Sequence, residues 1–574
     1  MIKEVLEKSI KTALWSLKID ESKISKISIE HPDDLTHGDY SCNIAMVLAK
    51  QVSQNPRELA EKIVAEINER KPEEISKIEV AGPGFINFYL STEFFIEQTK
   101  EILKTKNFGL NKNLKGEKTV VEYTDPNPFK EFHIGHLMSN AVGEAISRIV
   151  EANGAKIIRV CYQGDVGLHV AKTIWGIEQS SKGKKISFKT AFELGQAYVL
   201  GATSYEENEI KKNEIVDINK KIYDCSDKEV NKIYNLGRKI SLKYFEDIYK
   251  ILGTKFDNYF FESKTWPVGK QIVEKNIGKV FEKSEGAIIF KGENHGLHTR
   301  VFINKEGLPT YEAKELGLAK IKYDKTKYSK SIVVTGNEID EYFKVLLKAM
   351  SLIFPELASK TIHISHGMLR LPEGKMSSRT GDVITAVSLI DDIKQKVTEK
   401  MSDREMNKKE KEEIAQKVAI GALKYSILKQ VNGKDIIFDF DKSISFEGDS
   451  GPYLQYSYAR AKSILRKADK EGVKPKIYPS QIKNAFDGAS ITILEKLLYR
   501  FPEVVERAGN EYSPHYIATY LIELASSFNS FYAMGKIVDK ADIKSPYKVA
   551  LTETFSIVLK NGLNLLGIQT PEKM

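Results

Sequence analysis

Cysteine is scarce in this chain, with three residues among 574. Cys42, Cys161 and Cys225 lie far apart, and no Cys-x-x-Cys pair occurs. Disulfide frameworks and structural zinc sites both need more cysteines at closer spacing. The composition therefore argues against a disulfide-stapled fold and against a zinc site, and it favours a protein of a reducing cytosol.

Long apolar runs are missing as well. No stretch approaches the roughly 20 apolar residues that cross a bilayer, and the segment 1–19 carries acidic side chains and no small-residue cleavage site. We expect no membrane segment and a cytoplasmic location. The charge excess is small, at +9 with a pI near 8.9, which is compatible with a polyanionic partner but does not require one.

The chain does have length and an ordinary globular composition, with 41% hydrophobic and 29% charged residues. At about 150 residues per domain, this length predicts three to five domains. The patterns predict an α+β domain over 1–105, an α/β domain over 116–400 with a lysine-rich helical insertion at about 180–280, a helical connection over 401–445 and an all-helical domain over 446–574.

A βαβ unit opens the α/β domain. The expected elements are a strand over 119–123, a loop at the prolines of 125–128, a helix on the apolar stripe 134–149 and a second strand over 156–162. This alternation favours a parallel sheet. Strand-like runs return at 287–290, 331–334 and 361–364.

His133-Ile134-Gly135-His136 stands at the strand-to-helix turn of this unit. Imidazoles at i and i+3 share one helix face, and a helix N-terminus offers free N–H groups and a positive dipole end to an anion. Gly135 lets a flat ligand approach the backbone. The pattern favours a nucleotide site with the histidines near its phosphates; a chance string or a pair of metal ligands are the alternatives.

A second segment, Gly374 to Gly381, reads GKMSSRTG. A lysine in a Gly- and Ser-rich loop can reach a polyphosphate and stabilise charge that develops there. Taken alone, this pattern is more typical of an ordinary solvated basic loop.

Together, and in this order, the two segments resemble the HIGH and KMSKS motifs of class I aminoacyl-tRNA synthetases. Further strings resemble the arginyl family specifically, and they span essentially the whole chain: GDY (38–40), AGPGF (81–85), VEYTDPNPFKEFH (121–133), YQGDVG (162–167), LPTY (308–311), SGPYLQYSYAR (450–460) and LGIQTPEKM (566–574). The resemblance implies a Rossmann-type catalytic domain, an additional tRNA-binding N-terminal domain and an all-α anticodon-binding C-terminal domain.

It also implies an arginine–tRNA ligase that forms arginyl-adenylate from arginine and ATP and passes the arginyl group to the 3′ end of arginine tRNA, releasing AMP and pyrophosphate. The implied ATP-site residues are His133, Gly135, His136, Lys375, Met376 and Ser377. Ser378 stands where the KMSKS motif has its second lysine, and Lys130, three residues before His133, is implied as the substitute.

Arginine recognition requires paired acceptors for the planar guanidinium. By resemblance, Glu122 and Glu315 face the guanidinium, Asn127 holds the α-amino end and Tyr311 packs along the substrate; many family members have Asp in place of Glu315. Further candidates for this pocket are Asn337 and Glu338. Such a polar pocket is expected to reject lysine without an editing domain.

The family's tRNA contacts would fall on Tyr453, Tyr456 and Arg460, with Tyr458 as a further stacking candidate; a tyrosine stripe at helical spacing is also typical of a helix core. The resemblance implies Mg²⁺ as the ATP counter-ion, no zinc and a monomer.

Three other classes of protein remain open from the sequence. They are another class I synthetase such as the cysteinyl enzyme, a nucleotidyltransferase of the wider HIGH superfamily, and a synthetase-like RNA-binding protein with a dead site. The scattered cysteines, the long helical C-terminal third and the intact His133, His136 and Lys375 disfavour them in turn.

Overall fold

The computed structural model describes residues 2–19, 27–181, 187–370, 385–402, 406–477 and 491–574. The chain divides into two compact units. One comprises 1–108, 460–501 and 523–558, and the other comprises 109–459, 502–522 and 559–574. No helix among the described residues is long and apolar enough to cross a membrane.

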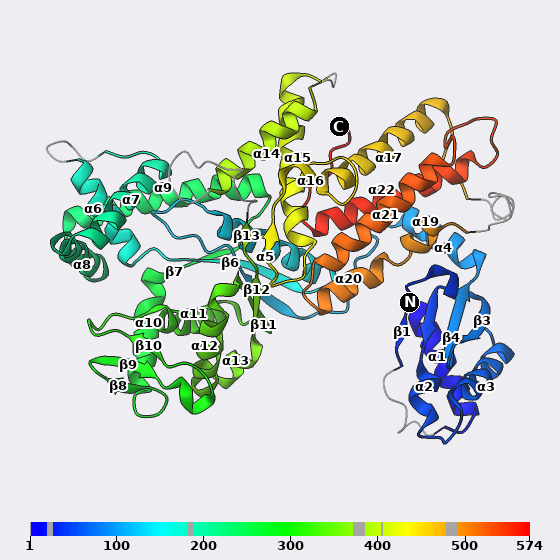
Figure 1. The fold of residues 1–574 in the computed structure, drawn as a ribbon, viewed down its shortest axis with the longest axis horizontal. Helices are drawn as coiled ribbons and strands as arrows, with labels where there is room; N and C mark the ends of the chain where they lie inside the picture. The colour runs from blue at the N-terminus through cyan, green and yellow to red at the C-terminus, as the bar shows by residue number, and fades with distance from the viewer. Residues whose placement is uncertain (1, 20–26, 182–186, 371–384, 403–405, 478–490) are drawn as a thin grey trace. The chain divides into compact units, whose positions relative to one another are not determined.

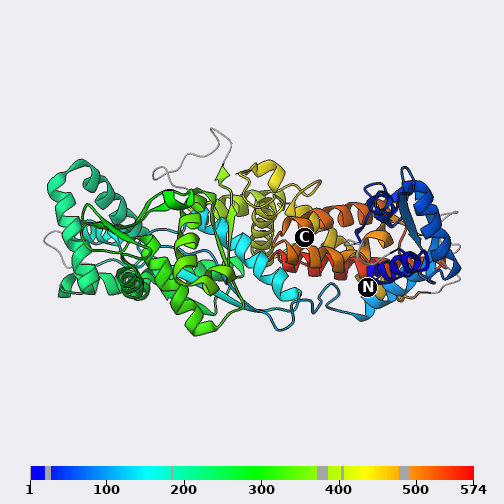
Figure 2. The same ribbon diagram turned by 90° about the horizontal axis from the view of Figure 1, so that it is seen from below.

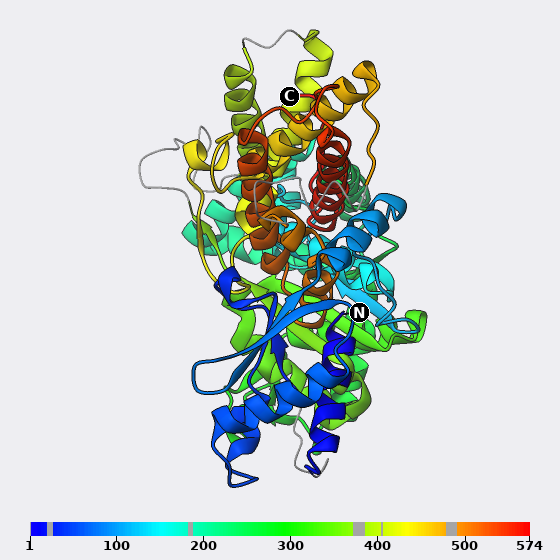
Figure 3. The ribbon, with the colours of Figure 1, turned by 90° about the vertical axis from the view of Figure 1, so that its right-hand side faces the viewer.

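The first unit contains a four-stranded antiparallel sheet in the order β1-β2-β4-β3. Its strands are coloured blue in Figures 1 and 3. Helix α1 and helix α3 pack against its core, where Leu6, Ile63 and Phe88 are fully buried. Asn55 caps α3 by accepting the N–H groups of the first turn, and Pro56 occupies a position whose N–H is not needed. The elements are α1 (Ile2–Ser16), β1 (Ile29–Glu30), β2 (Tyr40–Cys42), α2 (Ile44–Ala49), α3 (Pro56–Glu69), β3 (Ile75–Ala81), β4 (Phe85–Leu90) and α4 (Thr92–Lys104).

The second unit is built on a five-stranded parallel sheet in the order β12-β11-β5-β6-β7. From β5 the chain adds β6 and β7 on one side and later β11 and β12 on the other. A ligand crevice is expected where the order reverses, at the carboxyl ends of β5 and β11. The strands are β5 (Lys118–Glu122), β6 (Lys156–Gln163), β7 (Asn258–Phe261), β11 (Lys330–Gly336) and β12 (Thr361–His366).

Helices alternate with the strands of this sheet as the βαβ pattern predicts: α5 follows β5, α10 follows β7, α11 precedes β11, and α12 and α13 lie between β11 and β12. The helices are α5 (Ile134–Ala152), α10 (Glu262–Lys275), α11 (Tyr311–Thr326), α12 (Asp340–Ile353) and α13 (Pro355–Lys360). The run at 287–290 is a strand, but it belongs to a separate three-stranded antiparallel sheet of β8 (Glu282–Ser284), β9 (Ala287–Phe290) and β10 (Arg300–Ile303). This small sheet lies between α10 and α11 in the sequence. Periodicity predicts a strand but not its partner strands, so it could not assign 287–290 to one sheet or the other.

Between β6 and β7 the described residues (164–181 and 187–257) form four helices that pack on one another, coloured teal to green in Figures 1 and 2. They share an apolar core that includes Ile174, Leu194, Ile218 and Ile233. The helices are α6 (Leu168–Ser180), α7 (Ala191–Glu207), α8 (Glu209–Asp224) and α9 (Lys228–Leu252).

The regular elements described after β12 are helices, apart from a short parallel pair, β13 (Leu369–Arg370) with β14 (Ile436–Ile437). The helices are α14 (Ala386–Lys400), α15 (Lys408–Leu428), α16 (Phe440–Ser443), α17 (Gly451–Glu471), α19 (Ile493–Leu498), α20 (Phe501–Asn510), α21 (His515–Ala533) and α22 (Ser545–Leu565). The predicted fold class is confirmed in its three parts: the parallel sheet, the antiparallel N-terminal sheet and the helical C-terminal region.

Candidate active site

The corner between β5 and α5 holds both histidines. His133 caps α5, because its Nδ1 accepts the Gly135 N–H (3.1 Å), and the His136 Nδ1 accepts the His133 N–H (3.3 Å). The two rings stack with their centroids 3.6 Å apart. Burial lowers the pKa of both rings, and the Lys130 ammonium acts in the same direction.

Both imidazoles are therefore neutral at physiological pH. Since Nδ1 is the acceptor in each ring, the proton sits on Nε2. Neither Nε2 has a hydrogen-bond partner among the residues that the structure describes. The corner thus presents two N–H donors beside a helix N-terminus, an arrangement suited to phosphate oxygens.

The loop that leads into this corner is strained. Thr124, Asp125 and Phe129 have φ values of 79°, 45° and 71°, in the left-handed region that non-glycine residues avoid. Such residues cost of order 1–3 kcal/mol each and cluster at functional sites. Three hydrogen bonds hold them: Thr124 N–H to Ser139 Oγ (2.8 Å), Tyr162 N–H to Asp125 Oδ1 (2.7 Å) and Phe129 N–H to Ser241 Oγ (2.9 Å).

A group of carboxylates lies beside the loop. Glu122, 1% exposed, forms an ion pair with Lys322, with 2.6 Å between Oε2 and Nζ. Glu315 on α11 is half-buried, and none of the described residues donates a hydrogen bond to it or forms an ion pair with it. Burial and the charge of Glu122 raise the pKa of both Asp125 and Glu315, while the Lys322 ammonium opposes the rise. Three carboxylates beside one ammonium favour a cationic ligand.

A second buried ion pair adjoins this group. Lys314 Nζ lies 2.6 Å from Glu262 Oε2. It also lies 5.2 Å from the ring centroid of Tyr311, whose side chain is 61% exposed. Asn127 and Glu262 both lie against Gly164, since a Cβ built on Gly164 would fall 2.3 Å from Asn127 Oδ1 and 3.3 Å from Glu262 Oε1.

The structure therefore gathers the four residues expected at the arginine pocket, which are Glu122, Asn127, Tyr311 and Glu315. Of the two further candidates, Asn337 donates to the Gly433 carbonyl (3.3 Å). Glu338 is near His133. Burial and the Lys130 charge lower the pKa of His133, and the Glu338 charge raises it by a smaller amount.

Lys130 stands at the same corner. Its Nζ lies 4.5 Å from the ring centroid of Tyr198 on α7, and its charge helps to lower the pKa of His133 and His136. The expected loop residues Lys375, Met376 and Ser377 lie outside the described residues. Thr385, ten positions after Lys375, pairs with His133 in an antiparallel bridge.

The residues expected at the tRNA lie on α17. Tyr453 and Tyr456 are half-buried, and the Tyr456 ring lies edge-on to Phe446 at 6.1 Å. Arg460 donates to Asn529 Oδ1. Tyr458 is 2% exposed, so it belongs to the core and the expectation that it stacks on a base is wrong.

Several residues of this site escaped the reading of the sequence. The carboxylates are surrounded by Lys322, Lys314, Glu262 and Tyr342. Burial raises the pKa of Tyr342, and the charge of Glu315 raises it further. One signal was present, because Lys322 lies seven residues after Glu315 on the same face of α11. A buried lysine on that face calls for an acid opposite.

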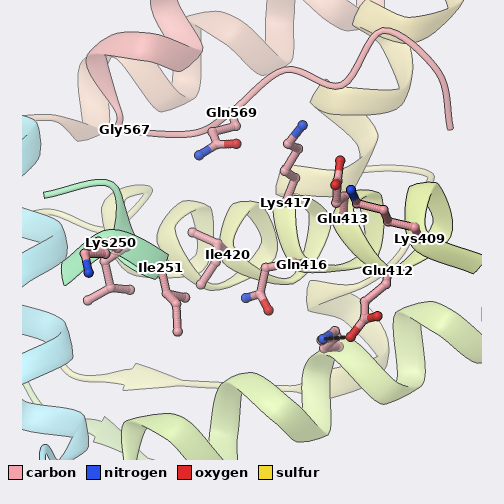
Figure 4. Close-up of a pocket in the computed structure, with 12 residues that line it drawn as sticks. Lys250, Ile251, Lys409, Glu412, Glu413, Gln416, Lys417, Ile420, Gly567 and Gln569 are labelled. Carbon is pink, nitrogen blue, oxygen red and sulfur yellow. Dashed lines mark hydrogen bonds and ion pairs between the residues drawn. The ribbon is translucent and has the colours of Figure 1, made fainter. Parts of the chain in front are cut away.

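A separate cavity of about 490 Å³ lies where the end of α9 meets α15 and the C-terminal segment (Figure 4). Its lining includes Lys250, Gln416, Lys417 and Gln569. Beside it, the buried Lys424 donates to the carbonyls of Leu252 (2.7 Å) and Gly567 (2.9 Å). None of the expected site residues lines this cavity, and the Lys424 contacts tie the last residues of the chain to the catalytic unit.

Comparison with known families bears on the identity of this site. The model of class I (R) tRNA synthetase catalytic domains matches residues 98–440, more than half of the chain. The arginyl tRNA synthetase N-terminal domain matches 2–90, and the DALR anticodon binding domain matches 454–574. The chain belongs to the arginyl-tRNA synthetase family. It is an arginine–tRNA ligase of class I, and these matches exclude the three other classes of protein that the sequence had left open.

Individual relatives agree with this assignment. The arginine–tRNA ligase of Clostridium acetobutylicum is 32% identical over 566 residues, covering 97% of each chain, and that of Oenococcus oeni is 31% identical over 564 residues with the same coverage. The solved arginyl-tRNA synthetase of Thermus thermophilus, 24% identical, has the same fold with a TM-score of 0.79 over 100% of both chains. The Plasmodium falciparum enzyme follows at 0.77 and 21% identity, covering 100% of this chain and 99% of that one.

Proposed function

We propose that the β5–α5 corner binds ATP and activates arginine as its adenylate. The arginine carboxylate attacks the α-phosphorus, the bond to the pyrophosphate oxygen breaks, and pyrophosphate leaves. The two Nε2–H groups of His133 and His136 donate to α-phosphate oxygens as negative charge builds there, and Gly135 leaves room for the nucleoside. Positioning and charge stabilisation supply most of the rate in such a transfer.

Lys130 and Lys375 supply the positive charge for the departing pyrophosphate, with Met376 and Ser377 beside Lys375. Lys130 takes the place of the lysine that Ser378 replaces. Two observations support this role: Lys130 acts electrostatically on both histidines, and Thr385, close in sequence to Lys375, pairs with His133.

The observation that carries the arginine assignment is the carboxylate group. Glu315, which has no ion-pair partner among the described residues, offers its carboxylate to the guanidinium, and Glu122, already paired with Lys322, adds negative charge beside it. Asn127 binds the α-amino end and Tyr311 packs along the side chain. In the second step, the terminal adenosine hydroxyl of arginine tRNA attacks the activated carbonyl and AMP leaves.

The other regions serve the tRNA. The N-terminal domain (1–105) is proposed to contact its body, and the C-terminal domain (446–574) its anticodon, with Tyr453, Tyr456 and Arg460 among the contacts. We propose that Mg²⁺ arrives on ATP, since no cluster of three metal-ligating side chains occurs in the described ranges. The enzyme is proposed to act as a cytoplasmic monomer without zinc.

Arginine-dependent ATP–pyrophosphate exchange, measured with and without arginine tRNA, tests the activity. Lys130→Ala should lower the exchange rate by about 10² or more, the scale of losing one charge-stabilising group, with the KM for arginine little changed. A wild-type rate in this variant would remove Lys130 from the mechanism, and a preference for another amino acid would overturn the pocket assignment.

A further inference from the structure

The Lys130 ammonium is held by an aromatic ring instead of an acid. Its Nζ lies 4.5 Å from the centroid of the Tyr198 ring, within the roughly 6 Å at which a cation is attracted to a ring face. None of the described carboxylates forms an ion pair with Lys130. Lys130 belongs to the loop before α5, whereas Tyr198 belongs to the helical insertion, so the contact joins two parts of the unit that are distant in sequence.

The position of α7 makes this contact possible. A Cβ built on Gly195, one turn before Tyr198, would lie 3.1 Å from Cγ of Glu131, the neighbour of Lys130. Three residues after Tyr198, a Cβ built on Gly201 would fall 1.9 Å from the Lys172 carbonyl of α6. Helix α6 begins five residues after the end of β6. Helix α7 is therefore packed tightly between the sheet-anchored α6 and the loop that carries Lys130.

Tyr198 also lies near the arginine side of the site. Burial and the Glu262 carboxylate raise the pKa of the Tyr311 hydroxyl, and Tyr198 is close enough to add to that rise. The same tyrosine is thus within electrostatic reach of one residue proposed for ATP and of one proposed for arginine.

We propose that Tyr198 is a positioning residue for adenylate formation, whose ring holds the Lys130 ammonium toward the ATP phosphates. A carboxylate in this place would fix the lysine equally well but would cancel its charge and repel the phosphates. A ring orients the cation while leaving its full positive charge available. This inference rests on the catalytic role proposed for Lys130.

The test compares pyrophosphate exchange by Tyr198→Phe, Tyr198→Leu, Lys130→Ala and the Tyr198→Leu/Lys130→Ala double variant. Phe keeps the ring face, and Leu keeps apolar bulk without it. Tyr198→Leu should lower the exchange kcat by about 3- to 30-fold. Tyr198→Phe, which keeps the ring, should retain a kcat within about 2-fold of wild type. In the Lys130→Ala background the Leu substitution should have little further effect, because no ammonium remains to be held.

Tyr205 provides a matched control. It lies on the same face of α7, is half-buried like Tyr198, and holds Lys172 Nζ 4.1 Å from its ring centroid. Tyr205→Leu therefore removes a similar contact from the same helix but should leave exchange unchanged. Thermal melting of both Leu variants measures the shared effect on helix packing.

The outcomes separate the two proposals. If Lys130→Ala retains wild-type exchange, the proposed role of Lys130 fails, and the inference fails with it. If Lys130→Ala is impaired but Tyr198→Leu is not, or if Tyr198→Leu costs the same with and without Lys130, only the role of Tyr198 is refuted. A Tyr198→Phe variant as impaired as Tyr198→Leu would also refute it, because the hydroxyl and not the ring face would then matter.

Discussion

Removing the charge of Glu315 should weaken arginine binding selectively. In the Glu315→Gln variant the arginine guanidinium keeps a hydrogen-bond acceptor at position 315 but loses the negative charge of the Glu315 carboxylate. Removing one partner of a desolvated charge pair costs about 2–5 kcal/mol, and because Glu315 is half-buried we expect the lower part of that range, about 2–3 kcal/mol. At about 1.4 kcal/mol per factor of ten, the arginine KM should rise roughly 30- to 150-fold.

The pH dependence of arginine binding provides a second measurement. Burial and Glu122 raise the pKa of Glu315 in the free enzyme, whereas arginine binds its ionised form. Arginine binding should therefore release protons and tighten as pH rises through the raised pKa. Isothermal titration calorimetry in buffers of different ionisation enthalpy measures this release, which should shrink in Glu315→Gln.

Asp324→Asn is the control, since Asp324 lies on the same helix but is exposed and forms surface ion pairs with Lys320 and Lys327. It should leave the arginine KM unchanged. If Glu315→Gln changes the arginine KM by less than about 3-fold, a difference far below the loss of a desolvated charge pair, Glu315 does not receive the guanidinium.

Two further predictions concern buried ion pairs. Lys322→Met leaves the Glu122 carboxylate buried without its partner and should lower the free energy of unfolding by about 3–5 kcal/mol. In thermal denaturation, the Glu122→Gln/Lys322→Met double variant should be less destabilised than Lys322→Met. Asp165 is fully buried two residues after the end of β6, and its ion pair with Arg238 of α9 (2.9 Å) connects the helical insertion to the sheet. Asp165→Asn breaks this pair, so limited proteolysis should cut the α6–α9 helices faster than in wild type. An unchanged rate would contradict this role of Asp165.

The sequence by itself determined the local structure, including the turn between β5 and α5 that carries the two histidines. The apolar stripe from Ile134 to Ile149 predicts α5, whose observed limits are Ile134 and Ala152, and the strands on either side fall within one residue of their predicted limits. These features depend on nearest neighbours along the chain, so periodicity, prolines and capping residues suffice to predict them. The two histidines were recognisable because both belong to one helix turn.

The tertiary structure alone decided which distant charges meet. Glu122 and Lys322 are 200 residues apart in sequence, and their ion pair exists because β5 and α11 pack together. The contact between Lys130 and Tyr198 likewise depends on how the insertion folds back on the loop before α5. No local pattern carries such pairings, because an ion pair or a cation over a ring constrains position in space and leaves the intervening sequence free.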